Sequence, residues 1–369
     1  MQQSVRTNVV AVVLTFNRAE RLAGVIAAID AQSRRIDHIL VVNNASSDST
    51  HELATAAIEK AAASGTVVEA RRNGGSAEGY YAALEWSQKQ GFGWAWFVED
   101  DLLPASDALE RLLDDTRASQ SDTVALASAV HDVEGTPLLV PRGCLRPRLL
   151  GTPCIPIPAR DYGSDAVRLE YFGFLGSLVK IEAVHRSGLP RRDMLGWIDD
   201  VDFSSRLART GSAWLVPASV VVHDDGTLAD EFGAGIIDRI RRLRSEPPIE
   251  TLWRNAYGLR NLLVWGRAFG IVQRRHAVAY VTLLVLRALA FARDHRVLRA
   301  RIYLRMGLDG WSGRIRNASP ESWSEIAGHR GSIASFLEEH RMTYDQPALA
   351  EKVTEVDAAP ASTSRPEGR

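Results

Sequence analysis

The chain has 369 residues, of which 46% are hydrophobic and 24% charged, and its formal net charge at pH 7 is −1. This composition is typical of a soluble globular protein with a substantial core, in one large domain or two. The start of the chain is polar, which argues against a signal peptide. Its two cysteines, Cys144 and Cys154, match no zinc or disulfide framework, which fits a cytosolic protein.

The near-neutral charge hides an asymmetry between the front and the rear of the chain. Residues 238–316 contain 17 arginines and only five acidic residues, so the remainder is acidic. This distribution argues against general nucleic-acid binding. It favours a rear surface that faces something anionic, such as a membrane.

The first hundred residues alternate between apolar β-branched runs and amphipathic stretches. The runs predict strands at residues 9–14, 36–42, 66–70 and 94–98, and the stretches between them predict helices at residues 21–32 and 52–63 and up to residue 89. Such alternation predicts a doubly wound parallel sheet with helices on both faces. Ligands of these sheets bind outside the carboxyl ends of the strands.

A polar loop follows each of these four strands, so all four loops are expected at one edge of the sheet. The loops are residues 15–18, 43–50, 71–79 and 99–101. No dinucleotide-binding glycine motif follows the first strand, and the chain has no P-loop. Loop 71–79 has three glycines and two arginines, which suits close approach to phosphates, although an ordinary helix entry has the same features.

Three consecutive acids, Glu99, Asp100 and Asp101, end the fourth predicted strand. Buried carboxylates repel one another and lose hydration, so folding alone does not favour them. A bound divalent cation would favour three acids at this position, because hard cations take oxygen ligands. The alternative is a polar strand end that leads into the next helix.

A second acidic cluster, Asp199, Asp200 and Asp202, follows Trp197 and Ile198 and begins a predicted helix. An apolar setting raises the pKa of a carboxyl group, which suits a general base. Acids that merely complement the helix dipole are the alternative. The next predicted strand, residues 213–222, ends at His223, which is a candidate metal ligand or a surface histidine.

The rear of the chain is helical and basic. We expect helices at residues 238–245, 249–269 and 277–305, and residues 346–369 read as a disordered tail. Residues 277–292 are apolar but shorter than the ~20 residues that a membrane span needs. They predict an interfacial helix on the cytoplasmic membrane face or, alternatively, a helix packed against the sheet or a second subunit.

The order of these features resembles the inverting family-2 glycosyltransferases of the GT-A fold, and most closely their bacterial rhamnosyltransferase and galactofuranosyltransferase branch. The segments that carry the resemblance are residues 12–18, 41–48, 72–79, 98–104, 199–202, 222–223 and 252–255. The resemblance implies a GT-A-type, Rossmann-like, doubly wound mixed α/β sheet with a helical, basic C-terminal region. It implies a catalytic domain at 1–235 (nucleotide-binding half 1–104, acceptor half 105–235), a helical region at 236–345 and the tail.

The resemblance also implies roles for individual residues. The nucleotide-sugar donor would be bound by Thr15, Asn17, Arg18, Asn44, Asp48, Arg72, Asn73, Gly74 and Asp100. Mn²⁺ or Mg²⁺ would be held by Asp101 and His223, with Glu99 at the first position of the D-x-D-type element. Asp200 would be the general base, with Asp199 and Asp202 as the other candidates.

The implied reaction moves a sugar, with galactofuranose or rhamnose favoured, from a UDP- or dTDP-sugar to a hydroxyl of a cell-wall or lipid-linked glycan. The anomeric centre would be inverted in a single displacement. The expected location is the cytoplasm, at the inner face of the cell membrane, as a peripheral protein or a homo-oligomer. The alternatives are a nucleotidyltransferase and a non-catalytic protein that binds sugar nucleotides.

Overall fold

The computed structural model describes residues 8–149, 152–224 and 246–357. Its centre is a ten-stranded sheet, with nine strands in one path and β9 (Val167–Leu169) beside β12. The path runs β13 (Leu349–Val356), β3 (Ser64–Ala70), β2 (His38–Asn43), β1 (Val9–Thr15), β4 (Trp94–Phe97), β11 (Ser177–Lys180), β6 (Thr123–His131), β12 (Ser212–His223) and β5 (Leu102–Pro104).

The side chains of β1 are buried on both faces of the sheet. Val9, Ala11 and Val13 belong to one buried core, and Val10 and Val12 belong to the other. A strand buried on both faces reads as a continuous apolar run, which is how the sequence predicted it.

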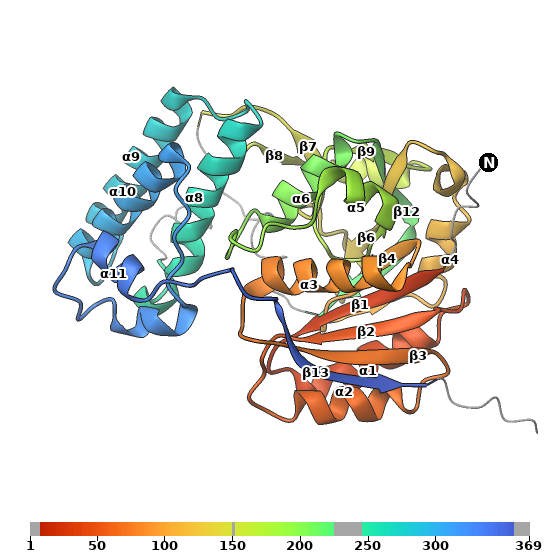
Figure 1. Ribbon diagram of the computed structural model, residues 1–369. Helices are drawn as coiled ribbons and strands as arrows, with labels where there is room; N and C mark the ends of the chain where they lie inside the picture. Colours follow the sequence, from red (N-terminus) through yellow and green to blue (C-terminus); the bar gives the residue numbers. More distant parts are fainter. Residues whose placement is uncertain (1–7, 150–151, 225–245, 358–369) are drawn as a thin grey trace, which may run out of the picture.

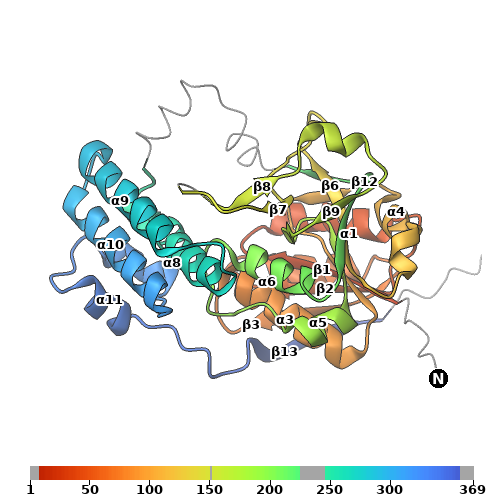
Figure 2. The same ribbon diagram turned by 90° about the horizontal axis from the view of Figure 1, so that it is seen from above.

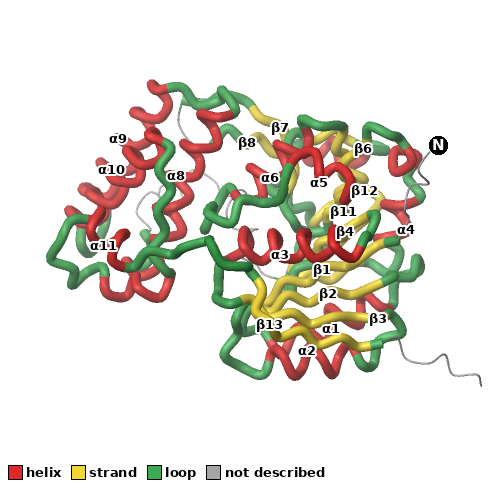
Figure 3. Tube along the Cα trace, in the orientation of Figure 1, coloured by secondary structure: helices red, strands yellow, loops and turns green. Residues whose placement is uncertain are grey.

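Helices on both faces complete these cores (Figures 1 and 3). One face is covered by α1 (Ala19–Asp30), α2 (Thr50–Ile58) and α4 (Ala108–Leu113), and the other by α3 (Gly75–Gln90), α5 (Ile181–Ser187) and α6 (Asp199–Ala208).

The sheet is mixed, as the family resemblance implied, and not all-parallel, as the alternation alone predicted. Strands β3, β2, β1 and β4 pair in parallel, as do β6 and β12. Strand β11 lies antiparallel between β4 and β6 and joins these two groups. Residues 135–162 contribute β7 (Arg142–Leu145) and β8 (Cys154–Pro156), which form a small sheet with β10 (Tyr171–Phe172).

The prediction of a disordered tail from residue 346 is wrong for residues 349–356. These residues form β13, which pairs antiparallel with the outer edge of β3, with Thr354 opposite Val67. The composition of the tail as a whole did not reveal that residues 349–356 can pair with a free sheet edge. Residues 358–369 lie outside the described part of the chain.

The rear of the chain forms a helical layer at one side of the sheet (Figure 2). It consists of α8 (Trp253–Ala268), α9 (Arg274–Phe291), α10 (Arg296–Ser312) and α11 (Ile333–Glu339), with a core of its own. The single helix predicted for residues 277–305 is two helices, because the chain breaks at His295, whose φ is +44°. The helix predicted at residues 238–245 lies outside the described residues. Over the described ranges, the helices are too short or too polar to cross a membrane.

Candidate functional site

The order of strands brings the four polar loops together at the carboxyl edge of the sheet. The loop after β1 contacts the loop after β2, because the Asn17 backbone N–H donates to Ser46 Oγ at 2.9 Å, and Asn17 Oδ1 accepts from the Ser47 N–H at 2.8 Å. The same loop reaches the loop after β4, where Arg18 Nη1 donates to Asp101 Oδ2 at 2.8 Å. The prediction of one shared edge is therefore confirmed for these loops.

Glu99, Asp101 and His223 form the acidic end of this edge. One ligand atom from each of the three side chains lies within 4.8 Å of the others. Strand pairing explains the position of the histidine, because β12 runs antiparallel to β5 with His223 opposite Leu102, the residue after Asp101. The distance from His223 Nε2 to Asp101 Oδ1 is 3.5 Å.

Burial disfavours the ionised form of the carboxyl groups at the end of β4. It raises the pKa of Glu99 to about 8, with further increases from the charges of Asp101 and Asp100. Burial also raises the pKa of Asp100 to about 6, although Arg18, whose Nε lies 3.8 Å from Asp100 Oδ1, partly offsets this. Desolvation and like charge are the two causes that a nearby cation would counteract.

The donor atoms of this cluster suit a divalent cation. Asp101 Oδ1 is buried and accepts no hydrogen bond from the described residues. A buried oxygen without a partner is costly unless an ion or water satisfies it. Carboxylate oxygens with one imidazole nitrogen are ligands that Mn²⁺ takes readily.

The second acidic cluster lies at the N-terminus of α6, and its three carboxylates have different surroundings. Asp202 pairs with Arg206, with Oδ2 2.9 Å from Nε, and Arg206 is held by the carbonyls of Ser187 and Gly188. Asp199 is buried and accepts a hydrogen bond from Ser76 Oγ at 2.5 Å. The contacts of Asp202 are those of a structural ion pair.

Asp199 and Asp200 form a pair of adjacent carboxyl groups at the start of α6. Burial raises the pKa of both carboxyl groups, and the charge of Asp200 raises that of Asp199 further. Opposing influences act on Asp200, because the Val201 N–H donates to its Oδ1 at 2.7 Å and the charge of Arg142 lowers its pKa. Asp200 is therefore the member that ionises more readily.

Several residues were predicted to bind the nucleotide. In the structure, their side chains form hydrogen bonds mainly with other parts of the protein. Asn44 Nδ2 donates to Asn73 Oδ1 at 3.0 Å, and Asn44 Oδ1 accepts from the Gly74 N–H at 3.3 Å, so this group ties two loops together. Asp48 accepts from the Thr50 side chain and N–H at the start of α2, and the side-chain bond lowers the pKa of Asp48. Thr15 is buried at the end of β1.

Arg72 is likewise engaged within the protein. Its Nε donates to Glu78 at 3.1 Å, and its guanidinium lies 4.7 Å from the centre of the Tyr344 ring. Glu78 is buried and also pairs with Arg192.

Two residues next to the acids were not identified from the sequence. Arg142 is fully buried and donates to backbone carbonyls, including those of Ser128 at 3.1 Å and Pro141 at 3.0 Å. It lies in a Pro- and Gly-rich stretch where nothing distinguishes a buried arginine from a surface one. Ser76 was within a predicted loop, but its partner Asp199 is 123 positions away.

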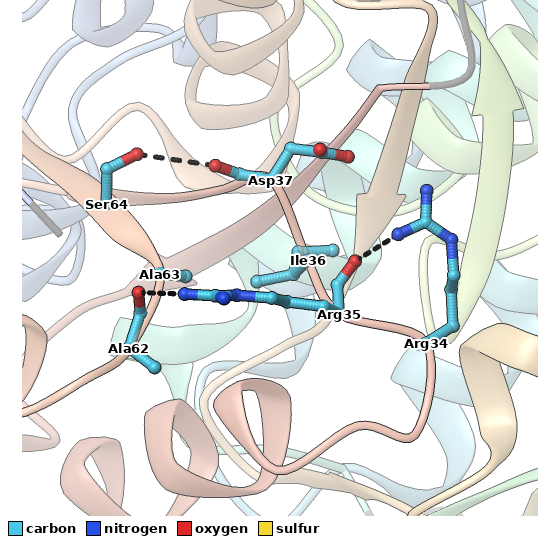
Figure 4. A pocket seen from close by; sticks show the side chains of 7 residues that line it. All are labelled: Arg34, Arg35, Ile36, Asp37, Ala62, Ala63 and Ser64. Carbon is cyan, nitrogen blue, oxygen red and sulfur yellow. Dashed lines mark hydrogen bonds between the residues drawn. The ribbon is translucent and has the colours of Figure 1, made fainter. Parts of the chain in front are cut away.

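A hollow of about 250 Å³ lies elsewhere on the molecule (Figure 4). Its lining residues are Arg34, Arg35, Ile36, Asp37, Ala62, Ala63 and Ser64, which precede or begin β2 and β3. This is the amino end of the parallel strands, opposite the edge that carries the acids. Ligands of open α/β sheets bind at the carboxyl ends, so this hollow is not the candidate site.

Comparison with known sequences identifies the domain. Residues 10–175 match the family described as Glycosyl transferase family 2. The chain is 28% identical over 205 residues to Galactofuranosyltransferase GlfT1 of Mycolicibacterium smegmatis, which covers 55% of this chain and 66% of that protein. The match thus spans somewhat less than two thirds of the relative's length.

Comparison with solved structures identifies the fold. The crystal structure of GalNAc-T7 with UDP, GalNAc and Mn²⁺ is 12% identical, with a TM-score of 0.53, and the match covers 92% of this chain and 58% of that one. The mannosyltransferase PcManGT from Pyrobaculum calidifontis with GDP-Man and Mn²⁺ is 18% identical, with a TM-score of 0.47, over 90% of this chain and 79% of that one. Residues 10–175 therefore match a glycosyl transferase family 2 domain, and the chain has the GT-A fold of the glycosyltransferase structure with TM-score 0.53.

Proposed function

We propose that this enzyme is an inverting, metal-assisted transferase that uses a UDP- or dTDP-sugar as donor and a hydroxyl of a cell-wall or lipid-linked glycan as acceptor. The observation that carries the proposal is the buried Asp101 Oδ1, which accepts no hydrogen bond within the described part of the chain and lies 3.5 Å from His223 Nε2, together with Asp200, which is near enough for its charge to raise the pKa of Glu99. The galactofuranosyltransferase relative favours galactofuranose as the transferred sugar, with rhamnose as the next candidate.

The donor side of the site would be residues 1–104, within a catalytic domain of residues 1–235. Asp101, His223 and Glu99 would hold Mn²⁺ or Mg²⁺. A bound divalent cation would neutralise charge that develops on the departing diphosphate. Asn17 and Arg18 would face the nucleotide, with Arg18 also orienting Asp101.

The acceptor side would use Asp200 as the general base. Its carboxylate would remove the proton from the acceptor hydroxyl, whose oxygen then bonds to the anomeric carbon as the bond to the diphosphate breaks on the opposite face. One displacement inverts the centre, and no carboxylate nucleophile is needed. Asp199 would hold a proton while Asp200 is ionised, because burial and the charge of Asp200 raise the pKa of Asp199 more than the hydrogen bond from Ser76 lowers it.

Replacing Asp101 with Ala should weaken Mn²⁺ binding at least ~10-fold, because a loss of this size follows even the mutation of residues that only hydrogen-bond to metal ligands. Thermal-shift assays with Mn²⁺ plus UDP or dTDP should lose the Mn²⁺-dependent stabilisation. The matched control is Asp224→Ala, which removes an exposed carboxylate that pairs with Arg21 at 3.5 Å. Wild-type Mn²⁺-dependent stabilisation of the Asp101 variant would refute the assignment.

Replacing Asp200 with Asn should lower turnover by about 10²–10⁴-fold, the usual contribution of a general base, with donor binding close to normal. Turnover can be followed as nucleoside diphosphate released from UDP-galactofuranose or dTDP-rhamnose with a membrane-extract acceptor. Asp202→Asn is the matched control, because Asp202 already pairs with Arg206. Equal losses from both variants would mean that the base is not Asp200.

The pH profile of kcat/KM should carry the signature of this buried pair. A base works only when ionised, and burial raises the pKa of Asp200. Activity should therefore fall as the pH drops through that raised pKa, well above the ~3.9 of an ordinary aspartate. An acidic limb in the ordinary aspartate range would contradict the proposal.

We further propose that the helical region, residues 236–345, docks on the cytoplasmic face of an anionic membrane. Helix α9 packs on α10 through its other side and leaves apolar side chains exposed, among them Leu286 at 58%, while α10 exposes Leu308 at 60%. Exposed arginines, including Arg274 and Arg275, precede this surface on α9. Apolar side chains with nearby arginines suit an interface between water and anionic lipid.

Flotation with vesicles of phosphatidylcholine and phosphatidylglycerol should recover the protein at low salt and less of it at high salt. Leu286→Glu should reduce recovery, whereas Val353→Glu, on the distant strand β13, should not. Absence of binding at low salt would refute membrane docking. Concentration-dependent dimerisation that Leu286→Glu abolishes would instead identify the surface as a contact between copies.

A further inference from the structure

The loop that leads into α6 has a strained backbone immediately before the proposed base. Ile198 has φ of +81° and Gly196 has φ of +101°. The left-handed region suits glycine, but for a β-branched residue such as isoleucine it is an outlier. Such a conformation persists only when surrounding structure holds it, and it concentrates at functional sites.

Helix α8 supplies what holds this loop. Asn261 is fully buried, and its Nδ2 donates to the carbonyls of Leu195 at 3.1 Å and Trp197 at 3.0 Å. The Leu195 carbonyl directly precedes Gly196, and the Trp197 carbonyl directly precedes Ile198. A single side-chain amide therefore fixes both peptide groups around the strained turn.

Arg260 fixes the orientation of that amide. It is also fully buried, and its Nε and Nη2 donate to Asn261 Oδ1 at 3.1 and 2.8 Å. Its Nη1 donates to the Arg316 carbonyl at 2.6 Å, and the guanidinium lies 4.5 Å from the centre of the Tyr257 ring. With the amide oxygen occupied by the arginine, the NH₂ group of Asn261 must face the loop.

The same helix approaches the loop and α6 at two further points. A Cβ added at Gly258 would lie 2.9 Å from Trp197 Cδ1, so only glycine leaves room for that indole. Trp265 Nε1 donates to Ser205 Oγ, inside α6, at 2.9 Å. Helix α8 thus lies beside α6, as Figure 2 shows, and contacts the segments on both sides of Asp200.

We infer that Asn261, oriented by Arg260, is a positioning residue that holds the Asp200 carboxylate in its working place at the start of α6. The inference rests on the proposed role of Asp200 as base. It assigns the helical region a part in the chemistry that is separate from any contact with a membrane. Nothing in α8 needs to touch the sugar or the nucleotide.

Asn261→Ala should lower kcat about 10–100-fold, the effect of misplacing a catalytic group by roughly an ångström. The donor KM and the stabilisation by UDP with Mn²⁺ should stay within about twofold of wild type, since Asn261 hydrogen-bonds to Leu195, Trp197 and Arg260, none of which is proposed to bind the donor. The matched control is Asn255→Ala, an exposed asparagine in the first turns of α8, which should leave kcat unchanged.

Two more variants separate positioning from general damage. If Asn261 acts through Asp200, Asn261→Ala should not further reduce the residual rate of Asp200→Asn, whereas a merely structural loss would lower both rates. Gly258→Ala, which displaces Trp197 without removing a buried polar group, should also lower kcat selectively; it stands in if Asn261→Ala does not fold.

Wild-type kcat in Asn261→Ala or in Gly258→Ala, with Asp200→Asn inactive, would overturn the positioning role and leave the base assignment intact. A parallel fall in kcat and in donor-dependent stabilisation would overturn it as well. Full turnover of Asp200→Asn would instead show that the proposed function itself is wrong.

Discussion

Buried negative charge at the end of β4 is the constraint on which the site depends. Glu99, Asp100 and Asp101 leave the sheet where water is scarce, and burial raises the pKa of Glu99 to about 8. Two side chains approach this charge: Arg18 from the loop after β1 pairs with Asp101, and His223 from the end of β12 lies 3.5 Å from Asp101. Both partners are far away in sequence, so the strand order is what makes the acidic cluster tolerable.

The negative charge of Glu99, Asp100 and Asp101 is only partly balanced by other side chains, and this imbalance bears on the function of the site. Asp101 Oδ1 has no hydrogen-bond donor in the described structure, although Arg18 occupies the other oxygen at 2.8 Å. Folding stability alone would favour fewer acids or more donors here. The same reasoning applies at the start of α6, where the strained Ile198 precedes the buried Asp199 and Asp200, and Asn261 of α8 hydrogen-bonds to the loop before them. Each half of the site carries an unfavourable feature that a catalytic role would explain.

The part of the fold that depends on local pattern could be predicted from the sequence. Continuous apolar runs gave β1, β2, β3 and β4, and the polar loops after them fell on one edge because parallel strands share direction. Strand β13 could not be predicted, because its existence depends on a free edge about 280 positions earlier, where Leu349 lies opposite Ala70. The reversed direction of β11 is likewise a property of the assembled sheet.

For the site, too, only the part that depends on the local sequence could be predicted. The residue types at the acidic motifs were visible in the sequence, but their partners were not. Helix α8 contains two Arg–Asn pairs, and the first, Arg254–Asn255, resembled a family element yet is exposed. The second, Arg260–Asn261, is fully buried and holds the loop before α6. Sequence alone cannot distinguish two such pairs on one amphipathic helix, because the difference lies in which turn of α8 faces the loop before α6.

The most direct test of the central claim is anomalous diffraction from crystals of the full chain grown with Mn²⁺ and UDP. The account predicts an anomalous peak at coordination distance, about 2.0–2.3 Å, from Asp101 and His223, next to the diphosphate. Manganese bound elsewhere, or a diphosphate bound beside these residues with no metal at saturating Mn²⁺, would contradict it.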